Sequence, residues 1–276
     1  MTLSFTKMQG LGNDFVVINA LTAPVKLNPK KIAQLSDRRH GIGFDQVLII
    51  EPSHDKTVDF HYRIYNADGS EAEQCGNGLR CIARYLYDRA WAPRKMLKLS
   101  CKGGIMEAEI EGSLIKVNMG IPSFAPKDIP CNMKTEHLIY TIPLDDAEIH
   151  MGLLSMGNPH AVICVDDLST VNIAHVGHVI STHALFPQGI NVNFMQVTQP
   201  YQAQLQVYER GVGATLACGS GACATMVYGN RLGILDREVS IMQPGGELVI
   251  NWAGGSNPVY MTGPAEFVFE GQWPIK

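Results

Sequence analysis

EQCGNGLRC (residues 73–81) and LACGSGAC (residues 216–223) decide the fold, because they contain the same motif. Each holds Cys-Gly-x-Gly, and Cys75 and Cys218 stand 143 residues apart in a chain of 276. The match extends upstream, where Tyr65 and Tyr208 each lie ten residues before their cysteine and end an alternating, strand-like segment. A repeat with a period of half the chain indicates two similar units.

A third pair of segments supports the repeat. GLGNDFVVIN (10–19) is similar to SMGNPHAVIC (155–164), and both place Gly-Asn just before a β-rich run. Asn13 and Asn158 are 145 residues apart, close to the spacing of the cysteines. Chance recurrence of a glycine-rich turn explains one such match, but not three in the same order.

The local patterns predict an α+β fold. Alternating or β-branched runs predict strands through most of the chain. A helix is predicted over residues 28–39, with Asn28 as its N-cap, and one more helix after each Cys-Gly-x-Gly motif. We expect two pseudo-symmetric domains, each a mainly antiparallel sheet curled around a central helix, with the active site in the cleft between them. The expected bounds are 1–119 plus 264–276 for the first domain and 120–263 for the second.

Composition excludes several classes of protein. Hydrophobic residues make up 46% and charged residues 17%, which is typical of a globular chain with a sizeable core. The net charge of −4 gives no basic face, so nucleic acid is not an expected partner. No apolar run has the length of a membrane helix, and we expect no membrane association. Seven cysteines, an odd number, with no visible signal peptide predict a cytoplasmic protein with reduced thiols.

The two motifs suggest one chemistry. A helix N-terminus offers unsatisfied N–H groups and partial positive charge, so each motif is suited to a carboxylate or phosphate. A cysteine there has its thiolate stabilised. Two such motifs could place Cys75 and Cys218 on opposite faces of the α-carbon of an amino acid. One thiolate would remove the α-proton, and the other thiol would return a proton on the opposite face. No cofactor and no metal are needed.

Other interpretations stay open at this point. The C-x5-C and C-x4-C spacings that begin at Cys75 and Cys218 are not those of a zinc site, and Cys81 and Cys223 are expected in the core as helix residues. A dithiol redox protein would lack the usual C-x-x-C motif. A cysteine hydrolase with His160 as base would leave the second motif without a purpose. A non-catalytic carboxylate-binding module would need no thiols at all.

The sequence also resembles a known family from end to end. MQGLGNDFVVINA, GIGFDQ, YNADGSEAEQCGNGLRC, SMGNPH, NVNFMQV, YERGVGATLACGSGACA and YMTGP are similar, in this order, to the motifs of diaminopimelate epimerases. The resemblance implies an isomerase that interconverts LL- and meso-2,6-diaminopimelate on the route to lysine and peptidoglycan, without pyridoxal phosphate or metal. A proline or hydroxyproline racemase of similar fold is the alternative.

The resemblance also implies roles for single residues. Cys75 and Cys218 match the two catalytic thiols, with Cys75 the proton donor and Cys218 the acceptor in one direction. His160 and Glu209 match positions that influence the thiol pKa values. The positions that match substrate contacts are Asn13, Gln46, Asn66, Gly76, Asn77, Asn158, Asn191, Glu209, Arg210, Gly219 and Ser220.

Two positions depart from the family pattern. Ala214 stands where the second motif usually has Glu, which puts in doubt any hydrogen bond that this Glu makes near the helix start. Phe269 stands where some members have a Tyr at a dimer contact, so the ring is kept and the hydroxyl is lost. A homodimer is therefore a further expectation from the resemblance.

Overall fold

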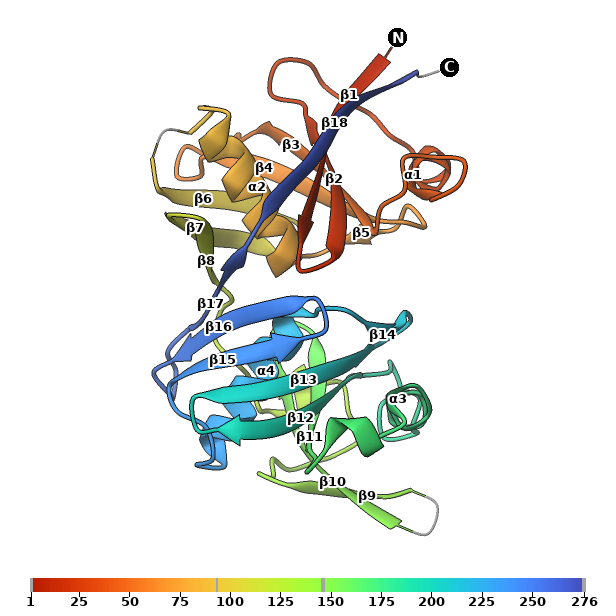
Figure 1. Cartoon of the computed structure of the whole chain (residues 1–276), viewed down its shortest axis with the longest axis vertical. Helices are drawn as coiled ribbons and strands as arrows, with labels where there is room; N and C mark the ends of the chain where they lie inside the picture. The colour runs from red at the N-terminus through yellow and green to blue at the C-terminus, as the bar shows by residue number, and fades with distance from the viewer. Residues whose placement is uncertain (1, 93, 145–146, 275–276) are drawn as a thin grey trace. The chain divides into compact units, whose positions relative to one another are not determined.

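The computed structural model describes residues 2–92, 94–144 and 147–274, and shows a mixed α/β protein made mostly of strands (Figure 1). The chain divides into two compact units, residues 1–118 with 262–276 and residues 119–261. The described residues form four α-helices and two short 3-10 helices among eighteen strands. None of these helices is long and apolar enough to span a bilayer.

The first unit contains two α-helices of eight residues or more and one long C-terminal strand. Its elements are β1 (Thr2–Gly10), β2 (Asn13–Asn19), α1 (Pro29–Ser36), β3 (Gln46–Pro52), β4 (Phe60–Asn66), β5 (Glu71–Ala72), α2 (Gly76–Asp88), β6 (Met96–Cys101), β7 (Gly104–Glu111), β8 (Leu114–Asn118) and β18 (Glu266–Pro274).

The second unit repeats this order from β10 onward, with β9 and two short 3-10 helices in addition. Its elements are η1 (Pro126–Asp128), β9 (Tyr140–Leu144), β10 (Ala147–Ser155), β11 (Pro159–Cys164), η2 (Leu168–Thr170), α3 (Ile173–Ser181), β12 (Asn191–Gln199), β13 (Gln202–Glu209), β14 (Gly213–Thr215), α4 (Gly219–Arg231), β15 (Glu238–Gln243), β16 (Gly246–Trp252) and β17 (Val259–Pro264), in which the chain passes back to the first unit.

The strand pairing repeats along with the order. In the first unit β2 pairs with β3 in parallel across α1, and β4 pairs with β6 in parallel across α2. In the second unit β11 pairs with β12 in parallel across α3, and β13 with β15 across α4. The hairpins that follow these crossovers are antiparallel, namely β3–β4, β6–β7, β12–β13 and β15–β16. Parallel neighbours need such helical crossovers.

Helices α2 and α4 begin where the sequence predicts. Cys75 and Cys218 are their N-caps, in extended backbone conformation. Both helices are largely buried, and Cys81 and Cys223 are fully enclosed, which confirms that these cysteines belong to the core. Burial raises the pKa of Cys81 to about 12, so that thiol stays protonated. Gly233, with φ +74°, follows the end of α4 as a left-handed stop.

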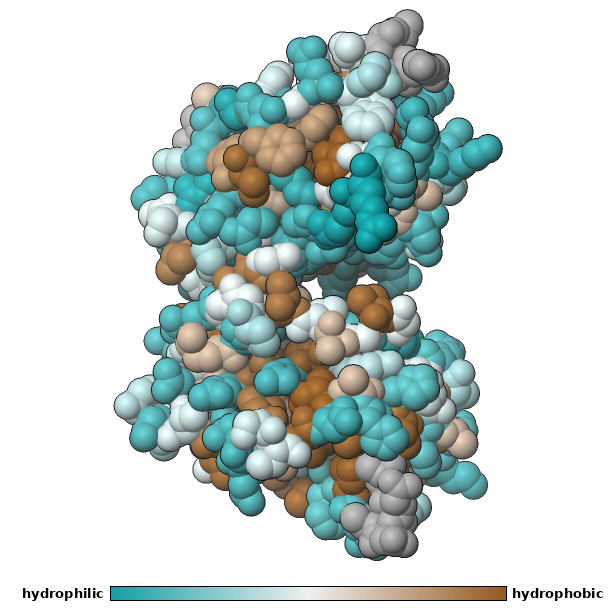
Figure 2. All heavy atoms as spheres, turned by 45° about the vertical axis from the view of Figure 1, so that its right-hand side comes forward, coloured by the Kyte–Doolittle hydropathy of each residue, from teal (hydrophilic) through white to brown (hydrophobic). Residues whose placement is uncertain are grey.

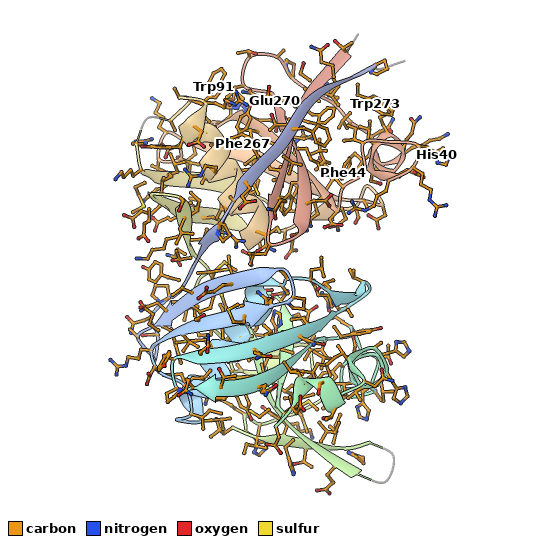
Figure 3. All side chains as sticks on the ribbon, viewed as in Figure 1. His40, Phe44, Trp91, Phe267, Glu270 and Trp273 are labelled. Atoms are coloured by element: carbon orange, nitrogen blue, oxygen red, sulfur yellow. The ribbon has the colours of Figure 1, made fainter. Side chains whose placement is uncertain are left out.

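The other local predictions were confirmed in part. Helix α1 has Asn28 as its N-cap, but it ends at Ser36 and not at residue 39, because Asp37 leaves the helical conformation. Strand β18 pairs antiparallel with β1, so the last segment joins the first unit. Ile32 and Leu35 of α1 belong to one core cluster of the first unit. Phe44, which is labelled in Figure 3, is part of the same cluster. The sequence patterns did not place helix α3 or strands β1, β5, β6, β9, β10, β14 and β15.

The surface is mainly hydrophilic on the face shown in Figure 2, where apolar side chains form small groups among polar ones. This distribution is usual for globular proteins. Strand β18 is one place where apolar side chains are exposed in succession. Phe267, Val268 and Phe269 are 37%, 54% and 48% exposed, and a register shift in β1 opposite them lies between Lys7 and Met8.

Candidate active site

In the first unit, Cys75 is the N-cap of α2. Its Sγ accepts the N–H of Gly78 at 3.4 Å and lies 3.9 Å from Oδ1 of Asn13. Asn77, in the first turn of α2, donates from Nδ2 to the same Asn13 oxygen at 3.2 Å. The cysteine and two predicted substrate contacts therefore form one cluster, which we call the Cys75 half-site.

A charged cluster holds Asn13 in place. Asn13 Nδ2 donates to Oδ2 of Asp45 at 2.9 Å, and Arg38 binds Asp45 and, through two nitrogens, Asp14. Lys7 forms a second ion pair with Asp14 at 2.6 Å. Although burial opposes it, hydrogen bonds from Arg38 and Lys7 lower the pKa of Asp14 to about 2. The Asp14 carboxylate is therefore charged at neutral pH.

Gln46 and Asn66 face each other across β3 and β4. Gln46 Nε2 donates to Oδ1 of Asn66 at 2.9 Å, and Asn66 Nδ2 donates to Oγ of Ser70 at 3.0 Å. Gln46 Oε1 is buried and has no hydrogen-bond partner among the described residues. Buried acceptors of this kind are uncommon in native proteins, and they suit a ligand donor such as an ammonium group.

Arg80 lies beneath this half-site with none of its side chain exposed. Its Nη1 donates to Oδ1 of Asn77 at 2.9 Å, and its Nε donates to the carbonyl of Pro264 at 3.0 Å. The guanidinium therefore determines which end of the Asn77 amide points toward Asn13. Neither Arg80 nor Asp45 was predicted from the sequence as a supporting residue.

In the second unit, Cys218 caps α4 and is only 6% exposed. Its backbone N–H donates to Oε1 of Gln243 at 2.8 Å, and its Sγ lies 3.6 Å from Oγ of Ser220. Burial raises the pKa of the Cys218 thiol well above its usual value, and the charge of Glu209 adds to the effect. The protonated thiol is therefore the favoured form here. Cys218 and its neighbours form the Cys218 half-site.

A chain of hydrogen bonds leads from Ser220 into the core. Asn158 Nδ2 donates to Oγ of Ser220 at 3.2 Å, and Nε2 of His160 lies 3.0 Å from Oδ1 of Asn158. The other ring nitrogen of His160 lies 3.1 Å from Nδ2 of Asn193. Burial lowers the pKa of His160 to about 3, so the ring is neutral.

Glu209 ends β13, and Arg210 follows it in the turn before β14. Thr215 donates from Oγ1 to Glu209 at 2.5 Å, which fixes the carboxylate. The backbone N–H of Arg210 donates to Oδ1 of Asn191 at 3.0 Å, and its Nη1 donates to the carbonyl of Gln188 at 3.0 Å. Asn191 in turn donates to the carbonyl of Pro159 at 3.0 Å.

Each half-site thus presents a thiol, a helix N-terminus and amide side chains of fixed orientation. N–H groups at such a helix start suit a carboxylate. In the described part of the chain, no cluster of three or more His, Cys, Asp or Glu side chains has the arrangement of a metal site.

Comparison with known proteins assigns the family. The profile of the diaminopimelate epimerase family matches residues 5–125 and 152–268. The chain is 47% identical over 274 residues to the diaminopimelate epimerase of Coxiella burnetii (strain RSA 493 / Nine Mile phase I), with 99% of each chain covered. This chain belongs to the diaminopimelate epimerase family. It is also 47% identical over 273 residues to the diaminopimelate epimerase of Chromobacterium violaceum, again with 99% of each chain covered.

Solved structures show the same fold at low sequence identity. A hydroxyproline epimerase from Agrobacterium vitis, with bound trans-4-hydroxy-L-proline, aligns with a TM-score of 0.70 at 14% identity, covering 99% of this chain and 92% of that one. A PhzF-family phenazine biosynthesis protein from Bacillus anthracis aligns with a TM-score of 0.69 at 14% identity, covering both chains completely. At this identity the likeness concerns the fold alone.

The residues assigned by resemblance fall into three places. The Cys75 half-site contains Asn13, Gly76 and Asn77, with Gln46 and Asn66 paired on β3 and β4. The Cys218 half-site contains Asn158, His160, Asn191, Glu209, Arg210, Gly219 and Ser220. Phe269 lies apart, on β18, and its ring packs edge-on against Phe5. Asn193 and Gln243 were missed, although the quoted motif NVNFMQV contains Asn193.

Proposed function

We propose that this chain is a cofactor-independent diaminopimelate epimerase that interconverts the LL and meso forms of 2,6-diaminopimelate. One observation carries the proposal: each unit places a cysteine at the N-cap of a buried helix, beside asparagine amides of fixed orientation. The family assignment supports the substrate. The reaction would serve lysine and peptidoglycan precursor synthesis, in the cytoplasm.

The proposed mechanism uses both half-sites on one α-carbon, in a cleft between two pseudo-symmetric domains, each a mainly antiparallel sheet around its helix. The thiolate of one cysteine takes the α-proton, and the C–H electron pair moves into the carboxylate to give an enediolate. The thiol of the other cysteine then donates its proton to the opposite face. The product has the inverted centre, and the two cysteines have exchanged thiol and thiolate.

The raised pKa of the Cys218 thiol suggests which cysteine donates the proton when the substrate first binds. A buried thiol beside Glu209 is suited to donate a proton, so Cys75 would be the base in that direction. Their roles reverse in the other direction. The N–H groups of Gly76, Asn77, Gly219 and Ser220 would stabilise the charge that develops on the carboxylate.

The other polar residues suit the distal amino-acid end of the substrate. Arg210 offers a guanidinium for the second carboxylate. Asn13, Gln46, Asn66, Asn158, Asn191 and Glu209 would supply the remaining donors and acceptors. A ligand that lacks the distal amino-acid end would leave these polar groups unpaired. Its binding would therefore be unfavourable, which gives specificity for diaminopimelate.

An isotope experiment tests the two-thiol mechanism. In heavy water, turnover of LL-diaminopimelate should place deuterium at the inverted α-carbon. Cys75→Ala and Cys218→Ala should each abolish epimerisation, while Cys164→Ala, which removes an exposed thiol, should keep it. Near-normal epimerisation by either active-site variant would contradict the mechanism.

Assays with different ligands distinguish the proposed epimerase from two other functions. The fold likeness to a hydroxyproline epimerase makes proline and hydroxyproline the competing substrates. Turnover of these, with none of diaminopimelate, would overturn the substrate assignment. A carboxylate-binding module would bind diaminopimelate without turnover, and its affinity would be unchanged in Cys75→Ala.

A homodimer through β18 belongs to the same proposal. Phe267, Val268 and Phe269 are exposed in succession on this strand, and Arg89 lies over the Phe267 ring at 5.4 Å while pairing with Glu270. Phe267 and Glu270 are labelled on β18 in Figure 3. An exposed apolar strand of this kind is typical of a protein interface.

Light scattering after size exclusion tests the dimer. Wild type should have twice the chain mass of 30.2 kDa, and Phe269→Asp should shift it toward the monomer. Tyr201→Asp changes an aromatic ring on the second unit that is more exposed than Phe269, and should leave the mass unchanged. A wild-type monomer at micromolar concentration would contradict the dimer.

A further inference from the structure

We propose that Asn193 is a positioning residue that fixes the tautomer of His160 and, through it, the orientation of the Asn158 amide. The inference rests on the proposed function, because Asn158 is there a substrate contact. Asn193 lies on β12, next to β11, which carries His160. The Asn193 side chain is completely buried.

The identity of each donor follows from one backbone carbonyl. Asn193 Nδ2 lies 2.9 Å from the carbonyl oxygen of Ala161, which can only accept a hydrogen bond. The atom in this position must therefore be the amide nitrogen and not the oxygen. The same nitrogen is 3.1 Å from Nδ1 of His160, so it donates its second hydrogen to the ring.

The remaining assignments follow along the chain. Because Nδ1 of His160 accepts, a neutral ring carries its hydrogen on Nε2, which donates to Oδ1 of Asn158 at 3.0 Å. The Asn158 nitrogen must then point to Oγ of Ser220, at 3.2 Å. The Ser220 oxygen lies 3.6 Å from Sγ of Cys218. One buried amide thus sets every donor between Ala161 and Ser220.

A buried asparagine at position 193 lowers stability unless its amide nitrogen has a function. Oδ1 of Asn193 is buried and has no hydrogen-bond partner in the part of the chain that the structure describes. A leucine of similar volume would fill the same space without an unpaired polar atom. The amide is therefore explained by its nitrogen, which alone selects the His160 tautomer.

The absence of a side chain at Gly221 leaves space for the Asn193 amide. A Cβ added there would lie 2.5 Å from Oδ1 of Asn193, closer than real contacts allow. The second glycine of this Cys-Gly-x-Gly motif thus lets the amide pack directly beneath the first turn of α4. The motif and Asn193 therefore depend on each other, although they are far apart in the sequence.

The tautomer can be read in the wild-type protein without any assay of turnover. Nitrogen-15 NMR of histidine-labelled protein should show one ring that stays neutral from pH 8 down to pH 5, with its hydrogen on Nε2. Loss of these signals in His160→Gln assigns them. A His160 ring that carries its hydrogen on Nδ1, or that is protonated at pH 7, would overturn the proposal.

A variant tests the consequence for the site. Asn193→Leu should give a mixture of His160 tautomers and lower kcat/KM for diaminopimelate at least tenfold, mainly by raising KM, because the Asn158 amide can then flip. Gln196→Leu is the matched control on the same strand, since it removes one hydrogen bond to the Leu168 N–H. It should lower stability without changing kcat/KM or the His160 signals.

The outcomes are distinguishable from failure of the proposed function. A wild-type protein that does not epimerise diaminopimelate contradicts the function, whatever the tautomer. An active wild type whose Asn193→Leu variant is folded and has unchanged KM contradicts the role of Asn193. If Asn193→Leu does not fold, the His160 tautomer measured by NMR in the wild-type protein decides whether the proposal holds.

Discussion

The side-chain oxygen of Gln243 accepts the backbone N–H of Cys218 at 2.8 Å, in a buried position. This N–H precedes α4 and so receives no partner from the helix itself. Gln243 ends β15, and its own Nε2 is buried without a hydrogen-bond partner among the described residues. The glutamine thus holds the start of the helix that carries the second thiol, at the cost of an unpaired amide nitrogen.

Gln243→Leu should therefore lower both stability and activity. The change leaves the Cys218 N–H buried and unpaired, which costs about 1–3 kcal/mol. Urea unfolding should show this loss, and kcat should fall because the thiol is less well positioned. Gln206→Leu, a half-buried glutamine on β13, is the control and should behave like wild type. An unchanged midpoint for Gln243→Leu would contradict a net stabilising role of this hydrogen bond.

Ala214→Glu should have little effect, although the family usually has Glu at this position. Ala214 is exposed on β14, opposite Tyr208, while the Cys218 N–H already has Gln243 as its acceptor. Exposed substitutions of this kind change stability by about 0.5 kcal/mol or less. We expect kcat/KM within twofold of wild type. A large gain of activity would mean that this chain lacks a contact that Glu restores.

The sequence predicts the parts of the site that are local and misses those that depend on strand register. Both helix starts could be predicted, because the N-cap, the glycines and the apolar spacing lie within a few residues. Asn193 and Gln243 could not, because their partners are 33 and 25 residues away and only sheet pairing brings them together. They look like ordinary polar residues of alternating strands.

The missed elements also have physical reasons. Strand β1 contains Lys7, whose buried ammonium is paired with Asp14, so a charged residue interrupts the expected apolar alternation. Helix α3 is rich in β-branched residues and contains Gly177, which lowers its helix propensity. Its N-cap Asn172, which accepts from the N–H of His175, was the available signal.

Asp14→Asn should remove part of the acid sensitivity of the first unit. The pKa of Asp14 is lowered to about 2, so its carboxylate stabilises the fold above its unfolded pKa near 4. This stabilisation is lost as the pH falls from about 4 to about 2. Because the ion pairs are partly solvated, we expect the loss to be about 1–2 kcal/mol.

Unfolding at pH 6 and pH 3 measures this effect. Wild type should lose stability between the two values, and Asp14→Asn should lose less while starting lower. Asp236→Asn changes an exposed carboxylate in the second unit and should keep the wild-type pH dependence. An equal pH dependence in Asp14→Asn and wild type would show that the cluster around Arg38 does not depend on the Asp14 charge.

Arg80→Lys should not be a conservative change. The guanidinium reaches Asn77 and the carbonyl of Pro264 through two different nitrogens, and the side chain is fully buried. A lysine ammonium is a compact charge that cannot reproduce this fork. Loss of one charged hydrogen bond costs about 1.5–3 kcal/mol. KM for diaminopimelate should rise as well, because the Asn77 amide is no longer fixed beside Asn13.

Thermal unfolding and steady-state kinetics check this prediction together. Arg39→Lys, at an exposed position of the same unit, is the matched control and should change neither quantity. Arg80→Lys with lowered stability but unchanged KM would mean that the arginine supports only the fold. If both quantities equalled those of wild type, the hydrogen bonds from Arg80 to Asn77 and Pro264 would contribute nothing to the half-site.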